Sequence, residues 1–277
     1  MNEEFKELYK AGETAGAAVE RLAAILKLLR GENGCPWDRV QTHESIKQCM
    51  IEEAYEALDA IERGDMDNLE EELGDLLLQV VFHGGIGSEN DNFDLNTIAN
   101  RVSDKMIRRH PHIFSKESAK TIDKVIEKWE NVKRQEKGEA SHSEILSEIP
   151  KALPALTRSY KIQAKAAEAG FDWDDVSGAF AKLDEERGEL IEAYNDGVED
   201  RLREELGDLL FSVVNVARFL GIDPEEALNG TSRKFIKRFH YIETTAREDG
   251  KKLEEMSLDE MDELWERAKA DESSFYK

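Results

Sequence analysis

Apolar residues recur at intervals of three or four along almost the whole chain, whereas alternating apolar and polar runs are scarce. Such spacing places apolar side chains on one face of an α-helix. The pattern therefore predicts an all-α protein, with loops at residues 34–38 and 90–92. Helices are expected near residues 15–30, 43–63, 67–85, 94–109 and 121–137, and again near 155–169, 177–196, 199–220, 224–248 and 257–270.

Two long acidic segments repeat each other. Residues 52–82 align without a gap to residues 185–215, and 16 of the 31 aligned positions are identical, where chance would give about two. The chain is therefore a tandem duplication. We expect a first helical domain over 1–137 and a second over 151–277, each a bundle of four or five helices, joined by a polar linker over 138–150.

Each copy also has a glycine inside a predicted helix, Gly74 in the first and Gly207 in the second. A glycine in a helix interior costs about 1 kcal/mol relative to alanine. Because the same costly choice occurs twice, we expect a close helix contact at both positions.

The chain is strongly acidic, with 38 Lys and Arg against 61 Asp and Glu and a formal net charge of −23. This charge disfavours nucleic acid and anionic membranes as partners, so a phosphate-bearing ligand would need local cations or bound metal. No apolar run reaches the length of about 18 residues that a membrane span requires. The start has no apolar signal core, and a cytoplasmic location without membrane contact is expected.

The two copies agree best in their carboxylates, which are spaced as EExxE and then ExxD. Residues three apart lie on the same side of a helix, so each motif is expected to form a same-side pair at the margin of an apolar stripe. The first stripe is expected to include Leu58 and Ile61, and the second Leu73 and Leu77. The selected acids are Glu53, Glu56, Glu72 and Asp75 in the first copy and Glu186, Glu189, Glu205 and Asp208 in the second.

Acidic runs usually form solvated helix faces, and this is the simplest interpretation of the repeated acids. Solvated helix acids are often matched by Lys or Arg four residues later. None of the eight selected acids has such a residue at that position. Unpaired acids beside a core repel one another unless a cation joins them. An all-oxygen ligand set favours Mg²⁺, with Mn²⁺ as the alternative.

Several motifs together resemble the MazG nucleoside triphosphate pyrophosphohydrolases, of the all-α NTP pyrophosphatase group. They are GCPWDRVQTHESI at 34–46, the two acidic repeats with their EELGDLL segments, KMIRRHPHIF at 105–114 and KFIKRF at 234–239. The resemblance spans nearly the whole chain. It implies two MazG-like helical domains, dependence on Mg²⁺, a homodimer, and cleavage of a nucleoside triphosphate to a monophosphate and pyrophosphate.

The resemblance also implies roles for individual residues. The family's metal ligands fall on the four acids already selected in the second copy. Its nucleotide contacts fall in the second copy on Lys182, Arg201, Arg203, Glu204, Lys234, Arg238 and Trp265. The first copy offers Lys105, Arg109 and Trp129, but Cys49 stands where the second has Lys182. We therefore expect the main active site in the second half.

The proposed reaction needs a base that accepts a proton from the attacking water, and Glu185 and Glu189 are the candidates. Trp265 and Trp129 suit stacking on a nucleobase, although a role as core tryptophans fits their helix pattern equally well. The alternative function is that of a non-catalytic, acidic helical protein whose carboxylates bind metal ions or basic partners.

Overall fold

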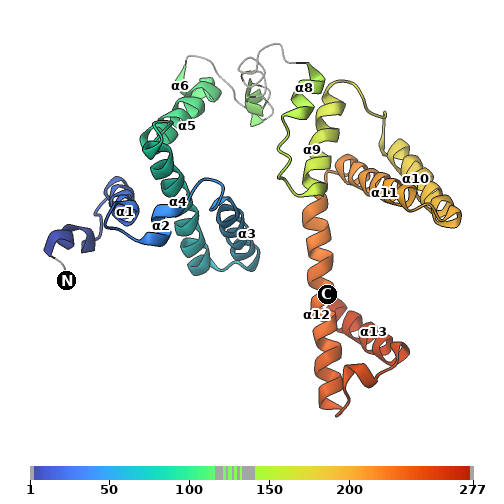
Figure 1. Cartoon of the computed structure of the whole chain (residues 1–277). Coiled ribbons are helices and arrows are strands. Elements are labelled where there is room, and N and C mark those ends of the chain that lie inside the picture. Colours follow the sequence, from blue (N-terminus) through green and yellow to red (C-terminus); the bar gives the residue numbers. More distant parts are fainter. Residues whose placement is uncertain are drawn as a thin grey trace. The chain divides into compact units, whose positions relative to one another are not determined.

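The chain is helical throughout the part that the structure describes. The computed structural model describes residues 3–115, 121–122, 124–126, 128–129, 132 and 141–274. It divides into two compact units, Met1–Gly138 and Glu139–Lys277 (Figure 1). No strand occurs among the described residues, which confirms the all-α prediction. None of the helices there combines the length and the apolar character needed to cross a membrane.

The first unit is built around two long helices that follow one another in the chain. Its elements are η1 (Glu3–Tyr9), α1 (Ala15–Arg30), α2 (Pro36–Val40), α3 (Lys47–Arg63), α4 (Met66–Glu89), α5 (Leu95–Arg109) and α6 (Pro111–Phe114). Helices α1 and α3 both pack on α4. The helix predicted over 121–137 lies largely outside the described residues.

The second unit repeats this plan and extends it. Its elements are α8 (His142–Ser147), α9 (Ala155–Glu168), α10 (Val176–Asp196), α11 (Glu199–Phe219), α12 (Pro224–Glu248), η2 (Leu253–Glu255) and α13 (Leu258–Ser274). Helices α9 and α10 pack on α11, and α13 packs on α12. The predicted helices of both halves, apart from 121–137, are present with ends that differ by four residues or fewer.

The segment before the first acidic repeat differs from expectation at one predicted loop, and the next helix begins four residues later than expected. Residues 34–38 were expected as a loop, but Pro36 begins α2, because proline is favoured in the first turn of a helix, where its missing N–H has no partner to lose. The helix expected from residue 43 begins only at Lys47. Before it, the N–H of Thr42 donates to Ser45 Oγ at 2.9 Å and the N–H of Ser45 donates to Thr42 Oγ1 at 3.2 Å.

The segment 138–150, expected as a polar linker, contains helix α8. Ser141 Oγ accepts a hydrogen bond from the N–H of Glu144 at 3.3 Å, and Glu144 Oε2 accepts one from the N–H of Ser141 at 2.7 Å. This reciprocal pair is a capping box, which satisfies backbone donors at a helix start. The polar residues that suggested a linker therefore include a helix-start signal.

Both acidic repeats fold into helix hairpins with the same turn. Gly64 ends α3 and Gly197 ends α10, and both have φ 67° and ψ 23°. This left-handed conformation is readily adopted by glycine because it lacks a Cβ atom. The N–H of Gly64 donates to Ile61 O at 3.1 Å, and that of Gly197 donates to Ala193 O at 3.2 Å. The turns lay α3 against α4 and α10 against α11, so that the EExxE and ExxD motifs come together.

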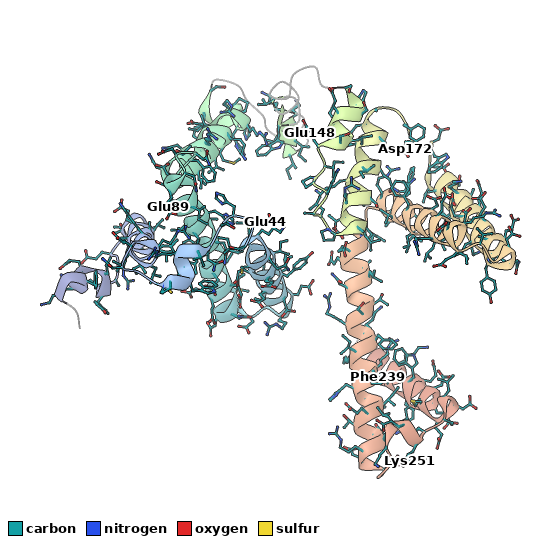
Figure 2. All side chains as sticks on the ribbon, in the orientation of Figure 1. Glu44, Glu89, Glu148, Asp172, Phe239 and Lys251 are labelled. Atoms are coloured by element: carbon teal, nitrogen blue, oxygen red, sulfur yellow. The ribbon has the colours of Figure 1, made fainter. Side chains whose placement is uncertain are left out.

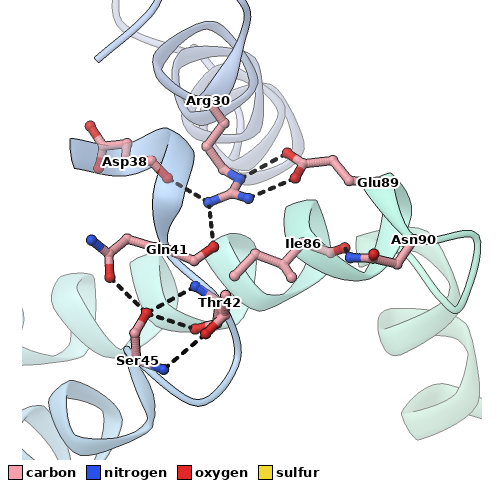
Figure 3. Close-up of polar contacts among 8 residues, drawn as sticks. All are labelled: Arg30, Asp38, Gln41, Thr42, Ser45, Ile86, Glu89 and Asn90. Carbon is pink, nitrogen blue, oxygen red and sulfur yellow. Dashed lines mark hydrogen bonds and ion pairs between the residues drawn. The ribbon is translucent and has the colours of Figure 1, made fainter. Parts of the chain in front are cut away.

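Arg30, at the end of α1, holds the first unit together through a buried guanidinium (Figure 3). Its side chain is 5% exposed and its Nε and Nη2 donate to the two carboxylate oxygens of Glu89 on α4 at 2.8 and 2.6 Å. Its Nη1 donates to the carbonyl oxygens of Asp38 at 2.6 Å and Gln41 at 3.3 Å. Beside it lies the core cluster of Leu26, Ile46, Val81, Phe82 and Ile86. Arg30 therefore ties the segment before α3 to both α1 and α4.

In the second unit, Arg218 similarly ties a segment between helices to the central helix. Arg218 on α11 donates from Nη1 and Nη2 to the carboxylate of Asp172 at 2.9 and 2.5 Å. Asp172 lies in the segment that joins α9 to α10 (Figure 2). Gln163 on α9 is buried and donates to the carbonyl of Phe211 on α11 at 2.8 Å. These contacts fix α9 and the start of α10 on α11.

Part of the apolar stripe beside the first carboxylates faces outward, contrary to prediction. Leu58, Ile61, Leu73 and Leu77 are all exposed, whereas Ala57 and Ala60 on the same helix as Leu58 are buried. The stripe is wider than the contact between two helices, so packing α3 on α4 covers only one side of it.

The glycines inside the helices also differ from expectation. Apart from the glycine's own helix, no atom of the described residues lies within 4 Å of the position that a Cβ atom would take at Gly74 or at Gly207. The close helix contact predicted at these positions is therefore absent among the described residues. Both glycines lie on exposed helix surface.

We expect Arg30→Met to lower the free energy of unfolding by about 2 kcal/mol, because it leaves Glu89 and two carbonyl groups without their donor.

Glu89→Gln should cost about 1 kcal/mol at neutral pH, since Glu89 is half exposed. The Arg30 hydrogen bond lowers the pKa of Glu89. Between the lowered pKa of folded Glu89 and the ordinary Glu pKa, the folded chain binds fewer protons than the unfolded chain. The stabilisation by Glu89 is therefore complete above the ordinary Glu pKa and is lost as pH falls through the lowered pKa.

Urea unfolding of the full chain at several pH values measures both effects, with Lys27→Met on α1 as the matched surface control. A cost of Glu89→Gln that stays constant down to the lowest pH would contradict the assignment.

Candidate functional site

The second hairpin gathers five carboxylates. Helix α10 contributes Glu185, Glu186 and Glu189, and α11 contributes Glu205 and Asp208. One oxygen from each of Glu186, Glu205 and Asp208 lies within 4.8 Å of the others, and the three acids of α10 form a second set of this kind. The structure therefore brings the four selected acids of this copy and the base candidate Glu185 into one region, with Glu186 common to both sets.

Glu186 is the buried centre of this region. It is 5% exposed, and its Oε1 lies 2.6 Å from Nζ of Lys182. Its Oε2 is buried and has no hydrogen-bond partner. A buried carboxylate oxygen without a donor is costly, because it has lost water and gained nothing in return. A cation that bound this oxygen together with Glu205 and Asp208 would remove that cost, so the residues present fit a metal ion.

Two cations of the chain already neutralise part of this region. Lys182 Nζ lies 2.7 Å from Glu185 and 2.6 Å from Glu186, and Arg201 Nε lies 3.5 Å from Glu205. The inference that these acids lack cationic partners was therefore wrong for the second half. The prediction rested on the residue four positions after each acid, whereas the two cations lie four positions before Glu186 and Glu205. Residues four positions apart are neighbours on a helix in both directions.

The second region raises the pKa of a lysine and of a glutamate, for different reasons. Hydrogen bonds to Glu185 and then Glu186 raise the pKa of Lys182 above its ordinary value, so this lysine stays charged. Desolvation, followed by the charges of Glu186 and Glu205, raises the pKa of Glu189. Among the described residues no ion pair involves Glu189.

The first hairpin gathers a similar but less neutralised set. Oxygens of Glu53, Glu72 and Asp75 lie within 4.8 Å of one another. Glu56 is not part of that group, but the charge of Glu72 is the first cause of its raised pKa. Desolvation and then the charge of Asp75 raise the pKa of Glu53.

No ion pair neutralises these four acids in the part of the first unit that the structure describes. The positions equivalent to Lys182 and Arg201 are the uncharged Cys49 and Asn68. Asn68 Nδ2 donates to Glu72 Oε1 at 2.7 Å. The two copies therefore share their acids but not their cations.

A basic and aromatic cluster forms between α12 and α13. The guanidinium carbon of Arg238 lies 5.4 Å from the ring centre of Trp265, and the ring of Phe235 lies 5.1 Å from it. Trp265 is half-buried, and Lys234 is exposed one turn before Arg238. The predicted phosphate and base contacts on these two helices thus lie together.

The first half has the same arrangement. The guanidinium carbon of Arg109 lies 5.4 Å from the ring centre of Trp129, and His110 meets that ring edge-on at 5.0 Å. Lys105 lies one turn earlier on α5 and lines a surface hollow of about 430 Å³ with Arg101 and Arg108. An arginine over a tryptophan face is therefore a second feature that both copies retain.

In the second unit, the basic and aromatic cluster does not meet the carboxylates within one chain. Helix α12 leaves α9 and α11 at Pro224, and α13 lies beside its far end (Figure 1). Arg238 is about 21 Å along the helix axis from Pro224 at 1.5 Å per residue. Figure 2 labels Phe239, the next residue, beside α13 and away from the α10–α11 hairpin.

Arg201, Arg203 and Glu204 lie on α11 near the carboxylates, but not all of them face the region. Arg201 contacts Glu205, whereas Arg203 points to Glu199 at 3.4 Å on an exposed face. Glu204 is also exposed. Of this predicted segment, only Arg201 touches a selected acid.

Comparison with known proteins gives the family. The model of the MazG nucleotide pyrophosphohydrolase domain matches residues 41–114 and again residues 175–242. The chain is 45% identical to "Nucleoside triphosphate pyrophosphohydrolase/pyrophosphatase MazG" of Thermotoga maritima, over 92% of this chain and 97% of that protein. It is 42% identical to "Nucleoside triphosphate pyrophosphohydrolase" of Escherichia coli K12, over 92% of this chain and 98% of that protein.

These matches place the chain, with its two helical hairpins and their clustered carboxylates, among the nucleotide pyrophosphohydrolases. The chain belongs to the MazG family. The resemblance seen in the sequence motifs is thereby confirmed, as is the tandem repeat of two all-α MazG domains.

The repulsion within the first hairpin predicts an unusual dependence of stability on pH. The raised pKa values of Glu53 and Glu56 mean that the folded chain binds more protons than the unfolded chain just above the ordinary Glu pKa. Without divalent cations, stability should therefore fall as pH rises through that window. Glu56→Gln removes one repelling charge and should raise the unfolding midpoint at pH 7 by a few degrees and flatten the slope.

Thermal unfolding in the presence of a chelator measures this, with Glu70→Gln, an exposed acid on α4, as the control. A lower midpoint for Glu56→Gln than for the parent at pH 7 would show that Glu56 has a stabilising partner instead.

Proposed function

We propose that this chain hydrolyses nucleoside or deoxynucleoside triphosphates to the monophosphate and pyrophosphate, with Mg²⁺ as the cofactor and Mn²⁺ as a substitute. We further propose that the main active site lies in the second half. The observation that carries this is the buried, unpartnered Oε2 of Glu186 at the junction of two carboxylate sets, beside Lys182. The first half, which lacks a counterpart of Lys182, would bind metal but turn over poorly.

The names of the relatives support the reaction. The proteins of Thermotoga maritima and Escherichia coli are both named as nucleoside triphosphate pyrophosphohydrolases, and they align with this chain over nearly its whole length. The alternative of a non-catalytic acidic binding protein explains the carboxylates but not the separate basic and aromatic cluster, which suits a nucleotide. The expected cytoplasmic location and the expected absence of nucleic-acid and membrane partners stay predictions.

In the proposed site, Glu186, Glu189, Glu205 and Asp208 would hold the metal ion. Bound there, Mg²⁺ would neutralise charge on the phosphate oxygens and acidify a water molecule. Of the two candidate bases, Glu185 is hydrogen-bonded to Lys182, whereas no ion pair among the described residues involves Glu189, so Glu189 is the better candidate. Lys234 and Arg238 would bind the departing pyrophosphate, and Trp265 would stack on the base.

We propose that these roles are combined in a homodimer, in which α12 and α13 of one chain meet the α10–α11 hairpin of the other. Within one chain the α10–α11 hairpin and helix α12 extend from α9 in different directions (Figure 1), so a single second unit would hold only half of the site. A second copy related by twofold symmetry would supply the other half to both.

Exposed apolar side chains support this pairing. Leu206, Leu210 and Phe211 on α11 are exposed, as are Ile236 and Phe239 on α12. Exposed apolar side chains grouped along one helix suit contact with a partner better than contact with water. Gly207 lies in the same stretch of α11 with open space where a Cβ would be, so a partner helix could approach its backbone closely.

Product analysis tests the reaction. With Mg²⁺ and a panel of nucleoside triphosphates, we expect the monophosphate and pyrophosphate, whereas diphosphate and orthophosphate would reject the proposal.

Glu205→Gln should lower kcat by at least about 100-fold, since it removes a metal ligand. Glu72→Gln, the matched change in the first half, should lower it by less than about threefold. Equal losses would refute the assignment to the second half.

Mixing two inactive variants tests whether the site is shared between chains. Glu205→Gln disables the carboxylates and Arg238→Ala disables the cations. If dimers exchange at random, half are mixed and each has one intact site, so activity should return to about a quarter of the parental value. Two sites that are each formed within one chain would show no recovery, and the Glu205→Gln protein mixed with Glu186→Gln serves as the negative control.

A further inference from the structure

The two hairpins differ at two positions that stand in the same relation to their acids. Lys182 and Arg201 precede Glu186 and Glu205 by one helical turn, and Cys49 and Asn68 occupy these positions in the first half. The second half therefore has two fixed cations beside its predicted ligands, and the first half has none at these positions. The hairpin turns are alike, and at these two positions the halves differ in charge.

Lys182 occupies oxygens that a metal ion would also use. Its Nζ lies 2.7 Å from an oxygen of Glu185 and 2.6 Å from Oε1 of Glu186. The other oxygen of Glu186 is buried and has no hydrogen-bond partner among the described residues. Arg201 is shared among Asp196 at 2.6 Å, Glu205 at 3.5 Å and Glu192 at 3.8 Å. The chain thus supplies its own cations to these carboxylates.

We propose that Lys182 and Arg201 act as internal counter-ions, which make divalent-cation binding at the second-half carboxylates weak until a triphosphate draws these side chains away. The inference rests on the proposed function of this site. It gives Lys182 and Arg201 a positioning role in the nucleotide-free protein, in addition to the phosphate contact that the family resemblance implies.

The physical reason is competition between charges. A lysine or arginine a few ångströms from a carboxylate repels an incoming divalent ion and must release its own hydrogen bonds before the ion can use those oxygens. Lys182 is 39% exposed, and its flexible stem allows it to turn toward solvent. Phosphate oxygens offer it an alternative partner of the same charge as the carboxylates.

Metal and nucleotide binding then become coupled. If the triphosphate removes Lys182 and Arg201 from the acids, the divalent ion binds more tightly in its presence, and by linkage the nucleotide binds more tightly in the presence of the ion. The second half would therefore remain largely free of metal until substrate arrives.

Mn²⁺ binding, followed by electron paramagnetic resonance of the free ion, tests this directly. The parental background is the full chain with Glu72→Gln and Asp75→Asn, which removes the first-half cluster. Adding Lys182→Met and Arg201→Met should increase Mn²⁺ affinity without nucleotide by about tenfold. A triphosphate analogue with a methylene bridge between the α and β phosphorus atoms should then increase Mn²⁺ affinity by a larger factor in the parental background than in the Met variant.

Charge-preserving variants serve as the matched control. Lys182→Arg with Arg201→Lys should keep the parental Mn²⁺ affinity, and the single change Lys182→Met should give part of the effect if the double variant folds poorly by circular dichroism. An unchanged or weaker affinity in folded Met variants would overturn the inference. If Glu186→Gln still abolished Mn²⁺ binding in that case, the proposed metal site would stand. Absence of Mn²⁺ binding in every variant, with and without the analogue, would instead reject the proposed site itself.

Discussion

Repulsion between clustered carboxylates is the constraint on which this structure depends. A tight turn lays two acidic helices side by side in each half, and the apolar contact between the helices holds the acids close whether or not they are neutralised. Each half meets the repulsion differently. The second half places Lys182 and Arg201 against its acids, whereas the first leaves Glu53 and Glu56 with raised pKa values.

The surfaces beside the acids follow from the same hairpin geometry. Two helices cover only one side of each apolar stripe, so Leu73 and Leu77 in the first half and Leu206 and Leu210 in the second remain exposed. In the second half, helix α12, which bears Lys234 and Arg238, leaves the hairpin instead of folding back over it. Such a chain is well suited to association with a second copy. One contact between two chains can cover the exposed apolar face and also bring the carboxylates of one chain to the cations of the other.

Helix positions were predictable because the 3.6-residue periodicity is strong along the whole chain, and the duplication provided an independent check. The acids could be chosen because residues three apart must share a helix side. Other features depend on tertiary packing. The exposure of Leu58 and Ile61 reflects how little of a stripe one neighbour covers, and the buried Oε2 of Glu186 depends on how α11 packs on α10. Lys182 and Arg201 precede their acids by one helical turn, whereas the prediction rested on the residues that follow each acid.

The identical turns at Gly64 and Gly197 have a consequence for how such a protein can change over evolutionary time. Each turn sets the register of its hairpin through the backbone, independently of the side chains further along the helices. Substitutions in either acidic row can then alter charge without disturbing the scaffold. Because the chain has two copies of the hairpin, the acids and cations of one copy can change while the other copy keeps the original chemistry.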